Sequence, residues 1–369
     1  MKVKCKKDDL LYGFQLVQNI ASSRTTLPIL GNVLFNAKGE TITLTATDLE
    51  IGMQIRIPSK IEKEGTTTLP AKKMFNLIRE LPNPDLQIEV ESNHLTNIFC
   101  GTSYFKIIGS SESDFPKLPS FDKKKGLSIG QKTLKDLVKK TAYAISKDET
   151  RYVLNGLLFS FQSDKVMVVA TDGRRLAMAT ASGKFTESEK EMIIPSKAVL
   201  EISKVLTDEG EVELIPFENQ VAFVVRNASD SDGCIIISRL VEGQFPNYKQ
   251  VIPEKVKERV VLDKEEFFSG IRRVSVVTNE KSSVIKLSFT KNLLTLSANT
   301  PEVGEAKEEI PISYEGPDTI LAFNPVYLVD VLKNLEEKEI TFEFNDSLSP
   351  GVIRSGNSFL YVVMPMRVS

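Results

Sequence analysis

The chain has 369 residues, of which 41% are hydrophobic and 26% are charged. This composition is typical of an ordinary soluble globular protein, and no run approaches the ~18 apolar residues that a membrane-spanning helix needs. The 47 basic and 49 acidic side chains leave a formal net charge of −2. Proteins that bind phosphate strongly are usually basic overall, so any charge that binds nucleic acid must be concentrated on one face.

Helical and strand-like segments alternate along the chain. Apolar residues recur at helical spacing at the start of each third of the sequence, in residues 6–23, 130–147 and 262–278. Each of these segments is followed by alternating runs that Gly, Asn or Asp turns interrupt, in residues 33–57, 156–180 and 285–310. A second amphipathic helix is then expected from Pro70, Pro195 and Asn324, because proline in a first turn loses no hydrogen bond and asparagine is a good N-cap.

This order of elements predicts one module that occurs three times. Pro70 and Pro195 are 125 residues apart, and Asn324 follows after another 129 residues. The ATD motif of Ala46–Asp48 returns 124 residues later at Ala170–Asp172. A period of this length is that of a domain. We therefore expect an α+β fold of three modules, each with two helices packed on antiparallel sheets, at residues 1–122, 123–254 and 255–369.

Two proline-containing stretches are expected to connect the modules. They are Pro116–Gly126 and Pro246–Arg259, and their proline content and charge are typical of exposed linkers. The segment DFPKL from Asp114 returns as QFPNY from Gln244, 130 residues later. The repeat therefore extends into the connections between the modules.

Basic residues recur on the predicted helices. On a helical wheel, the second helix of each module has apolar residues on one side and a cation off that side. These cations, Arg79, Lys204 and Lys333, occupy equivalent positions in the three modules. The first helices of the second and third modules add Lys132, Lys135, Lys139, Lys140, Arg272 and Arg273. Each of these residues alone could be an ordinary solvated charge. Their repetition on one face is typical of a surface that attracts a polyanion.

No catalytic chemistry is indicated. His94 is the only histidine, no His/Cys cluster has zinc spacing, and no glycine-rich phosphate loop occurs. We expect no catalytic residue, metal or cofactor. A hydrolase that uses Asp48, Asp172 and a metal is a second hypothesis, although equivalent positions in two modules should lie apart and Asp172-Gly173 favours a tight turn. A three-domain scaffold unrelated to DNA is a third.

The cysteines and the N-terminus indicate where the protein works. Cys5, Cys100 and Cys234 are odd in number and far apart, so we expect reduced, partly buried thiols and no disulfide framework. The first residues, MKVKCKKDDLLYG, lack the apolar segment and cleavage site of a signal peptide. We therefore expect a cytoplasmic protein.

Seven segments together resemble one known family. They are LPILGN (Leu27–Asn32), TATDLE (Thr45–Glu50), TTTLPAKKMF (Thr66–Phe75), RYVLNGLLF (Arg151–Phe159), VATDGRRLA (Val169–Ala177), VEGQFPNY (Val241–Tyr248) and YVVMPMR (Tyr361–Arg367). In this order they are similar to the bacterial sliding clamp, the β subunit of DNA polymerase III. The resemblance implies a non-enzymatic head-to-tail homodimer whose six modules close a ring, with helices around the hole and sheets outside. Such a ring encircles duplex DNA without reading its sequence and confers processivity on the polymerase.

The resemblance also implies functional residues. The DNA-facing residues would be Arg24, Lys72, Arg79, Arg151 and Lys197, to which the helical wheels add Lys204, Arg272, Arg273 and Lys333. A pocket between the second and third modules would receive short linear peptides from polymerase subunits, the clamp loader and repair proteins. Its residues would be Leu154, Thr171, Gly173, Arg174, Arg175, Leu176, Pro246, Val251, Asn324, Tyr327, Leu348, Val362, Met364, Pro365, Met366 and Arg367. At the dimer interface, Phe105 and Ile107 of an edge strand would meet Val276 and Val277 of the partner.

Overall fold

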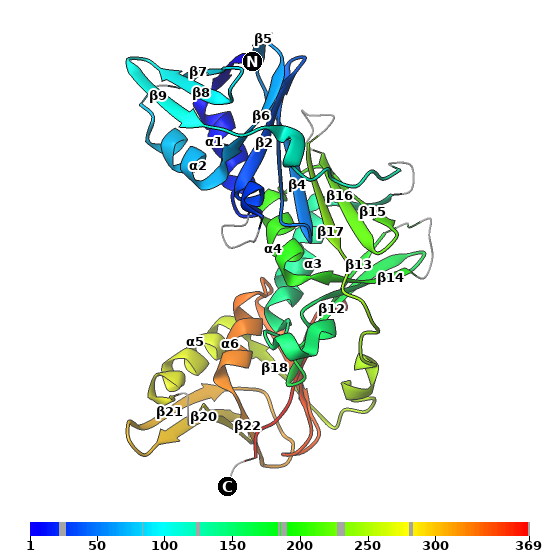
Figure 1. The fold of residues 1–369 in the computed structure, drawn as a ribbon. Coiled ribbons are helices and arrows are strands. Elements are labelled where there is room, and N and C mark those ends of the chain that lie inside the picture. The colour runs from blue at the N-terminus through cyan, green and yellow to red at the C-terminus, as the bar shows by residue number, and fades with distance from the viewer. Residues whose placement is uncertain are drawn as a thin grey trace. The chain divides into compact units, whose positions relative to one another are not determined.

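The computed structural model describes residues 1–21, 27–82, 84–122, 126–183, 185, 190–226, 233–279 and 283–367 (Figure 1). Among the predicted site residues, Arg24 lies outside the described residues. The chain divides into two compact units, each of which combines two stretches of sequence. The first contains Met1–Lys135 and Lys197–Leu240, and the second contains Asp136–Ser196 and Val241–Ser369.

The first unit contains two antiparallel sheets. The five-stranded sheet has the order β5 (Lys60–Lys63), β1 (Lys2–Lys6), β7 (Asp85–Val90), β8 (Leu95–Cys100) and β9 (Ser103–Ile108). The eight-stranded sheet has the order β10 (Leu127–Gly130), β15 (Glu211–Phe217), β16 (Gln220–Arg226), β17 (Cys234–Arg239), β4 (Ile51–Pro58), β3 (Thr41–Thr47), β2 (Asn32–Lys38) and β6 (Gly65–Pro70). The pairing of β17 with β4 joins strands of the second predicted module to strands of the first.

The second unit repeats this arrangement. Its eight-stranded sheet has the order β14 (Lys190–Pro195), β11 (Gly156–Phe161), β12 (Lys165–Thr171), β13 (Arg175–Ser182), β25 (Phe359–Val363), β24 (Gly351–Ser355), β23 (Glu339–Phe344) and β18 (Glu258–Asp263). The four-stranded sheet has the order β21 (Gly304–Pro311), β20 (Leu293–Thr300), β19 (Ile285–Thr290) and β22 (Thr319–Phe323). Here β13 pairs with β25, so the second predicted module is also continuous with the third. The strands of the second module are thus divided between the two units.

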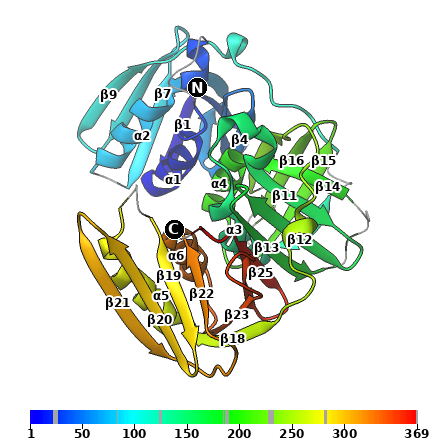
Figure 2. The same cartoon turned by 90° about the horizontal axis from the view of Figure 1, so that it is seen from below.

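The α-helices are α1 (Lys7–Val17), α2 (Ala71–Glu80), α3 (Gln131–Thr141), α4 (Ser196–Val205), α5 (Lys264–Val274) and α6 (Pro325–Lys333). Short 3₁₀ helices are η1 (Pro28–Gly31), η2 (Glu112–Asp114), η4 (Ala142–Ala144), η5 (Glu149–Leu154), η6 (Tyr248–Val251) and η7 (Ser275–Val277). The predicted α+β fold, with helices packed on antiparallel sheets, is confirmed. In the second unit, α5 and α6 lie side by side, and α5 also packs on β20 and β21 (Figures 1 and 2).

The helix boundaries differ from the prediction in detail. Pro70 and Pro195 end strands β6 and β14, and their helices begin one residue later, because the backbone is still extended at Pro70 (φ −65°, ψ 111°). Pro325, by contrast, lies in the first turn of α6, where the Asn324 side chain accepts a hydrogen bond from the Val326 amide (2.9 Å). The N-cap prediction is therefore confirmed.

Glycine sets how closely two of the helices approach their sheets. A Cβ added at Gly13 in α1 would lie 2.5 Å from the Ile57 Cδ1 atom, and one added at Gly270 in α5 would lie 2.9 Å from the Leu296 Cδ1 atom. Both glycines are the seventh residue of their helix. The sequence repeat therefore includes a packing position that the helical wheels did not reveal.

Candidate functional site

Most of the predicted DNA-facing cations on the helices have an acidic or aromatic neighbour. The contacts are Arg79–Glu80 (3.0 Å), Lys204–Glu201 (2.7 Å), Arg273–Glu308 (2.6 Å), Lys197–Asp48, and Arg272 over the ring of Phe268 (5.6 Å). Lys72 and Lys333 are exposed. The Arg79–Glu80 pair is exposed on both sides, and such a pair contributes only about 0–1 kcal/mol, so a phosphate group can replace this acidic partner at little cost. The helices therefore offer a moderate positive charge.

The cations of α3 are neutralised in the same manner within each unit. In the first unit, Lys135 lies 2.8 Å from Asp208. In the second unit, the remaining pairs are Lys139–Glu336 (2.6 Å) and Lys140–Glu337 (3.2 Å). The hydrogen bond from Lys139 lowers the pKa of Glu336 below its ordinary value. These carboxylates stay charged at neutral pH, and they reduce the positive potential of the predicted stripe.

Among the predicted DNA-facing residues that the structure describes, Arg151 alone lies on no α-helix. It belongs to η5, where its backbone is non-helical (φ −107°, ψ 54°). Its guanidinium lies 3.5 Å from a carboxylate oxygen of Asp148 and donates to the carbonyl oxygen of Asp172 at 3.4 Å. The structure therefore places Arg151 beside the turn that carries several predicted peptide-binding residues.

The two ATD motifs form the same tight turn. The Asp172 carboxylate accepts hydrogen bonds from the amides of Arg174 (2.9 Å) and Arg175 (3.0 Å), and Asp48 accepts the same bonds from the amides of Glu50 (3.0 Å) and Ile51 (2.8 Å). Both aspartates therefore have a structural role in their own modules. This use of the carboxylates removes the motivation for the hydrolase hypothesis.

Arg175 lies below the predicted peptide-binding surface. Its side chain is 9% exposed and bonds to the carboxylates of Asp172 (3.0 Å) and Asp330 (2.6 Å) and to the carbonyl oxygen of Tyr143 (2.6 Å). The guanidinium also stacks on Tyr327, 4.6 Å from the ring centroid. A planar guanidinium can satisfy several acceptors at once. Arg175 thus joins β13 to α6, a role that no sequence motif indicated.

Replacing Arg175 with methionine is expected to lower the free energy of unfolding by about 3 kcal/mol, because Asp172 and Asp330 would lose their shared cation in a partly buried site. Arg174→Met provides the matched control, since Arg174 is exposed. A surface substitution of this kind usually changes stability by less than about 0.5 kcal/mol. Urea unfolding followed by circular dichroism measures both variants. Equal losses in the two variants would contradict the assigned role of Arg175.

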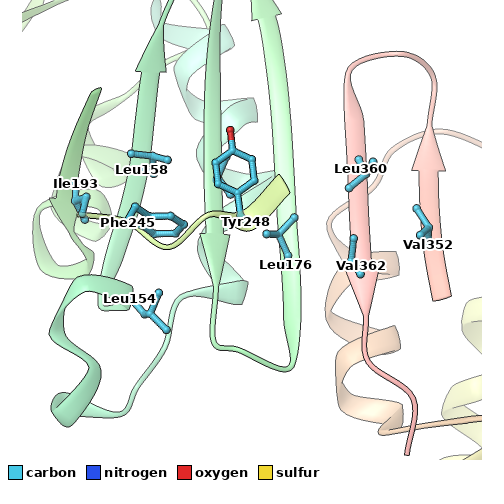
Figure 3. Packing of buried hydrophobic residues seen from close by; sticks show 10 residues of the cluster. Leu154, Leu158, Leu176, Ile193, Phe245, Tyr248, Val352, Leu360 and Val362 are labelled. Carbon is cyan, nitrogen blue, oxygen red and sulfur yellow. The ribbon is translucent and has the colours of Figure 1, made fainter. Parts of the chain in front are cut away.

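The apolar part of the predicted peptide site is a continuous cluster in the second unit. Leu154 from η5, Leu176 from β13 and Val362 from β25 belong to it (Figure 3). Leu176 and Val362 are paired across the β13–β25 junction and are only 2% and 1% exposed. Val362 is therefore a core residue of the sheet as well as part of the predicted site. A ligand can reach this buried cluster only past the more exposed residues beside it.

The rim of the site is exposed and apolar. Met364 and Met366 are 40% and 38% exposed, Leu348 is 75% exposed and Val251 is 41% exposed. Hydrogen bonds fix the methionine segment, since the Met364 amide donates to the Arg174 carbonyl (2.9 Å) and the Met366 amide donates to the Ala322 carbonyl (2.8 Å). Flexible methionines on a fixed backbone suit a surface that binds apolar side chains of several shapes.

The remaining predicted residues also belong to the second unit. Thr171 and Gly173 form the turn, with Gly173 at φ +84°; Asn324 caps α6, and Pro246, Pro365 and Arg367 lie at or near the surface. The prediction missed Phe245 and Tyr248, which are both 9% exposed and pack in the same cluster (Figure 3). The second linker is therefore less exposed than expected. The repeat of DFPKL as QFPNY was the signal that could have identified these anchors.

Of the predicted dimer-interface residues, Phe105 and Ile107 lie on the edge strand β9, whereas Val276 and Val277 lie on η7, beside the edge strand β21. Among the described residues, β9 pairs only with β8, and β21 pairs only with β20. Phe105 and Ile107 on β9 are partly buried. Val276 is 78% exposed on η7, which contacts β20 and β21, and Val277 is partly buried. Unpaired strand edges with apolar neighbours are suited to pairing with another chain.

The three matching family models are the N-terminal, central and C-terminal domains of the DNA polymerase III beta subunit, at residues 1–119, 128–247 and 249–367. The chain is 32% identical over 369 residues to the beta sliding clamp of Chlamydia pneumoniae, covering 100% of this chain and 99% of that protein. The beta sliding clamp of Pseudomonas aeruginosa is 33% identical over 374 residues, with 100% of both chains covered.

Solved structures give the same result. The DNA polymerase sliding clamp of Bacillus subtilis superimposes with a TM-score of 0.93 at 30% identity, and a sliding clamp of Pseudomonas aeruginosa bound to griselimycin with 0.93 at 32%. Both comparisons cover 100% of each chain. No helix in the described part of the chain is long and apolar enough to cross a membrane.

Proposed function

The chain belongs to the DNA polymerase III beta subunits, the bacterial sliding clamps, and from this premise we propose that two copies close head to tail into a ring around duplex DNA. As a sliding clamp the protein is a non-catalytic processivity subunit. We also propose that it works in the cytoplasm and that its modules have the boundaries 1–122, 123–254 and 255–369.

The observation that supports the ring is the rule by which the modules join. In each junction, a strand that follows an ATD turn pairs with the last strand of the next module: β4 with β17, and β13 with β25. By the same rule, β21 in the third module of one copy is expected to pair with β9 in the first module of another copy. Because one chain supplies both edges, two copies make two identical contacts. Heterologous contacts of this kind close a ring when the rotation allows it.

The register of the proposed contact follows from the two junctions within the chain. Ala46 pairs with Met53, Ala170 with Ala177 and Ala298 with Ala306, which makes Met53, Ala177 and Ala306 equivalent. Val3, Leu127 and Val260 each lie four residues before the first helix of their module, so they are equivalent. Three successive strand pairings lead from them to Phe105, Ile236 and Tyr361, respectively, and these three residues are therefore equivalent as well.

These equivalences give specific pairs across the subunits. Met53 pairs with Ile236 and Ala177 with Tyr361, so Ala306 is expected opposite Phe105. One position further, Gly52–Ile237 and Leu176–Val362 correspond to Glu305 opposite Lys106. Opposite charges at directly paired positions of a sheet are favourable by about 0.2–1 kcal/mol, and like charges are unfavourable. The proposed contact is therefore complementary in charge.

Solution mass tests the ring. The wild-type protein is expected at twice its chain mass of 41.1 kDa. Lys106→Glu should raise the dimer dissociation constant by about 30-fold, because about 1 kcal/mol is lost at each of two contacts. Combining Lys106→Glu with Glu305→Lys should restore the dimer. Light scattering over a dilution series measures all three proteins, and a failure of the double variant to recover would refute the register.

The proposed ring needs only weak contact with DNA. The candidates are Lys72, Arg79, Arg151, Lys197, Lys204, Arg272, Arg273 and Lys333, together with Arg24. Attraction to phosphates is independent of sequence and decreases with salt, so it permits sliding. A closed ring does not need strong binding, because it is retained by geometry.

The exposed methionines and the apolar cluster support a peptide site for polymerase subunits, the clamp loader and repair proteins. We propose that it lies at the β13–β25 junction, where Leu176 and Val362 are paired and the exposed Met364 directly follows β25. Griselimycin is proposed to bind the same site here. Apolar anchor residues of a partner would bury their side chains against this cluster, as helical or extended peptides do in other grooves.

A further inference from the structure

The β4–β17 junction of the first unit has the same position in the repeat as the proposed peptide site. Gly52 pairs with Ile237 there, as Leu176 pairs with Val362 at the β13–β25 junction. A small cavity of about 130 Å³ lies at this place, and its lining includes Thr47, Leu49, Gly52, Leu118, Ile237 and Arg239. The first unit therefore has a second groove that corresponds to the peptide site.

The first linker already occupies this groove. A Cβ atom added at Gly52 would lie 2.4 Å from the Leu118 Cδ2 atom, so Leu118 rests directly on the backbone of β4. Phe121 stacks on Phe217 of β15, with 5.7 Å between the ring centroids and 28° between the planes. Both linker residues pack against a buried cluster that contains Ile237. An extended segment with two apolar anchors three residues apart thus lies on the sheet in the manner of a bound peptide.

The second junction differs at the residues that make this possible. Leu176 stands at the position of Gly52, so a side chain takes the space that Leu118 fills in the first junction. Tyr248, the counterpart of Leu118, has its hydroxyl 3.7 Å from the Met167 sulfur, on strand β12. Val251, at the position of Phe121, is 41% exposed. The second linker therefore packs its anchors in the cluster beside Leu176, and no side chain of the linker occupies the position that Leu118 takes over Gly52.

We propose that residues 116–121 are a built-in occupant of a second groove for apolar peptides, and that Gly52, Leu118 and Phe121 keep this groove closed. The proposal rests on the proposed peptide site only for the class of ligand. A tethered segment acts at an effective concentration of about a millimolar, so a free peptide of similar intrinsic affinity displaces little of it below that concentration. Each subunit then has one open peptide site, the proposed site at the β13–β25 junction.

Equilibrium dialysis with a synthetic peptide of residues 114–122 tests the proposal, at up to about 1 mM peptide, the range of the tethered occupant. The double variant Leu118→Ala/Phe121→Ala of the full chain is expected to bind one more equivalent per subunit than the wild type. Adding Gly52→Ala to the double variant, which places a Cβ atom where the Leu118 side chain lies, should abolish the additional binding. Ser120→Ala, at an exposed linker position, and Leu118→Met are expected to match the wild type.

Hydrogen exchange then locates the added peptide. Protection is expected at β4 and β17 of the double variant, and its circular dichroism spectrum and solution mass must match those of the wild type. If the double variant does not fold, the single variant Leu118→Ala is tested for the same gain of bound peptide. No increase in bound peptide over the wild type would overturn the proposal. The number of peptide equivalents that the wild type binds tests the proposed β13–β25 site separately. Failure of that site is therefore distinguishable from failure of the second groove.

Discussion

A clamp loaded onto a closed DNA circle is expected to remain there in high salt, and to leave after a nuclease cuts the circle once. Binding through phosphate contacts alone decreases steeply with salt: six to ten contacts lose about 10³–10⁵ in affinity between 50 and 200 mM. The retention of a ring on DNA does not depend on salt in this way while both the ring and the DNA circle stay closed. We expect the half-life on the closed circle to exceed that on cut DNA by at least about 100-fold, a difference too large for salt-sensitive contacts to produce.

The measurement is gel filtration of loaded circles in high salt, before and after cutting. Lys106→Glu serves as the matched control, because it weakens the proposed ring closure without changing a helix cation. It should shorten retention on the closed circle. Neutralising Lys204 and Lys333, which occupy the same module position, should slow loading in low salt and leave retention in high salt unchanged. Equal retention on closed and cut DNA would refute the topological mechanism.

The same experiment separates the functional hypotheses. A metal-dependent hydrolase would degrade or release the DNA, and an unrelated scaffold would show no preference for closed circles. The structure already weakens the first hypothesis, since Asp48 and Asp172 bond the amides of their own turns. Changing Asp172 to asparagine should therefore disturb the turn and its contact with Arg175.

The repeat made most of the fold predictable. The spacing of Pro70, Pro195 and Asn324 identified three modules, and the alternation of helical and strand-like runs gave their element order. Both signals are local and depend on burial periodicity, which a single sequence records well. Helix ends were less accurate, because the extended backbone of Pro70 belongs to a strand whose pairing cannot be seen in sequence.

The pairing between modules could not be predicted in the same way. Whether β17 meets β4 depends on contacts between segments far apart in the chain, and no short motif encodes them. The same limit applies to the contacts of Arg175, which the resemblance placed among the peptide-binding residues. Its partners Asp330 and Tyr143 come from other parts of the sequence. The linkers illustrate a second limit, since their prolines and lysines indicated exposed segments although Leu118 is partly buried and Tyr248 is buried.

Deleting Pro365–Ser369 is expected to weaken griselimycin binding by at least about 100-fold, which corresponds to about 2.7 kcal/mol, while the protein remains a dimer. The deletion removes Met366 from the rim and the hydrogen bond from its amide to Ala322. The remaining Met364 would then lose the segment that fixes it beside the site. Calorimetric titration measures the affinity, and solution mass measures the dimer.

The matched control is the shorter deletion of Val368–Ser369, which retains Met364 and Met366 and should bind as the wild type does. Together the two deletions assign the loss to residues 365–367. The proposed dimer contact depends on β9 and β21, and neither strand includes the deleted residues. A dimer that dissociates would therefore indicate a general loss of structure. Unchanged affinity in the longer deletion would reject the assignment of the chain end to the peptide site, because an apolar ligand held by Met366 must lose contact area when that residue is removed.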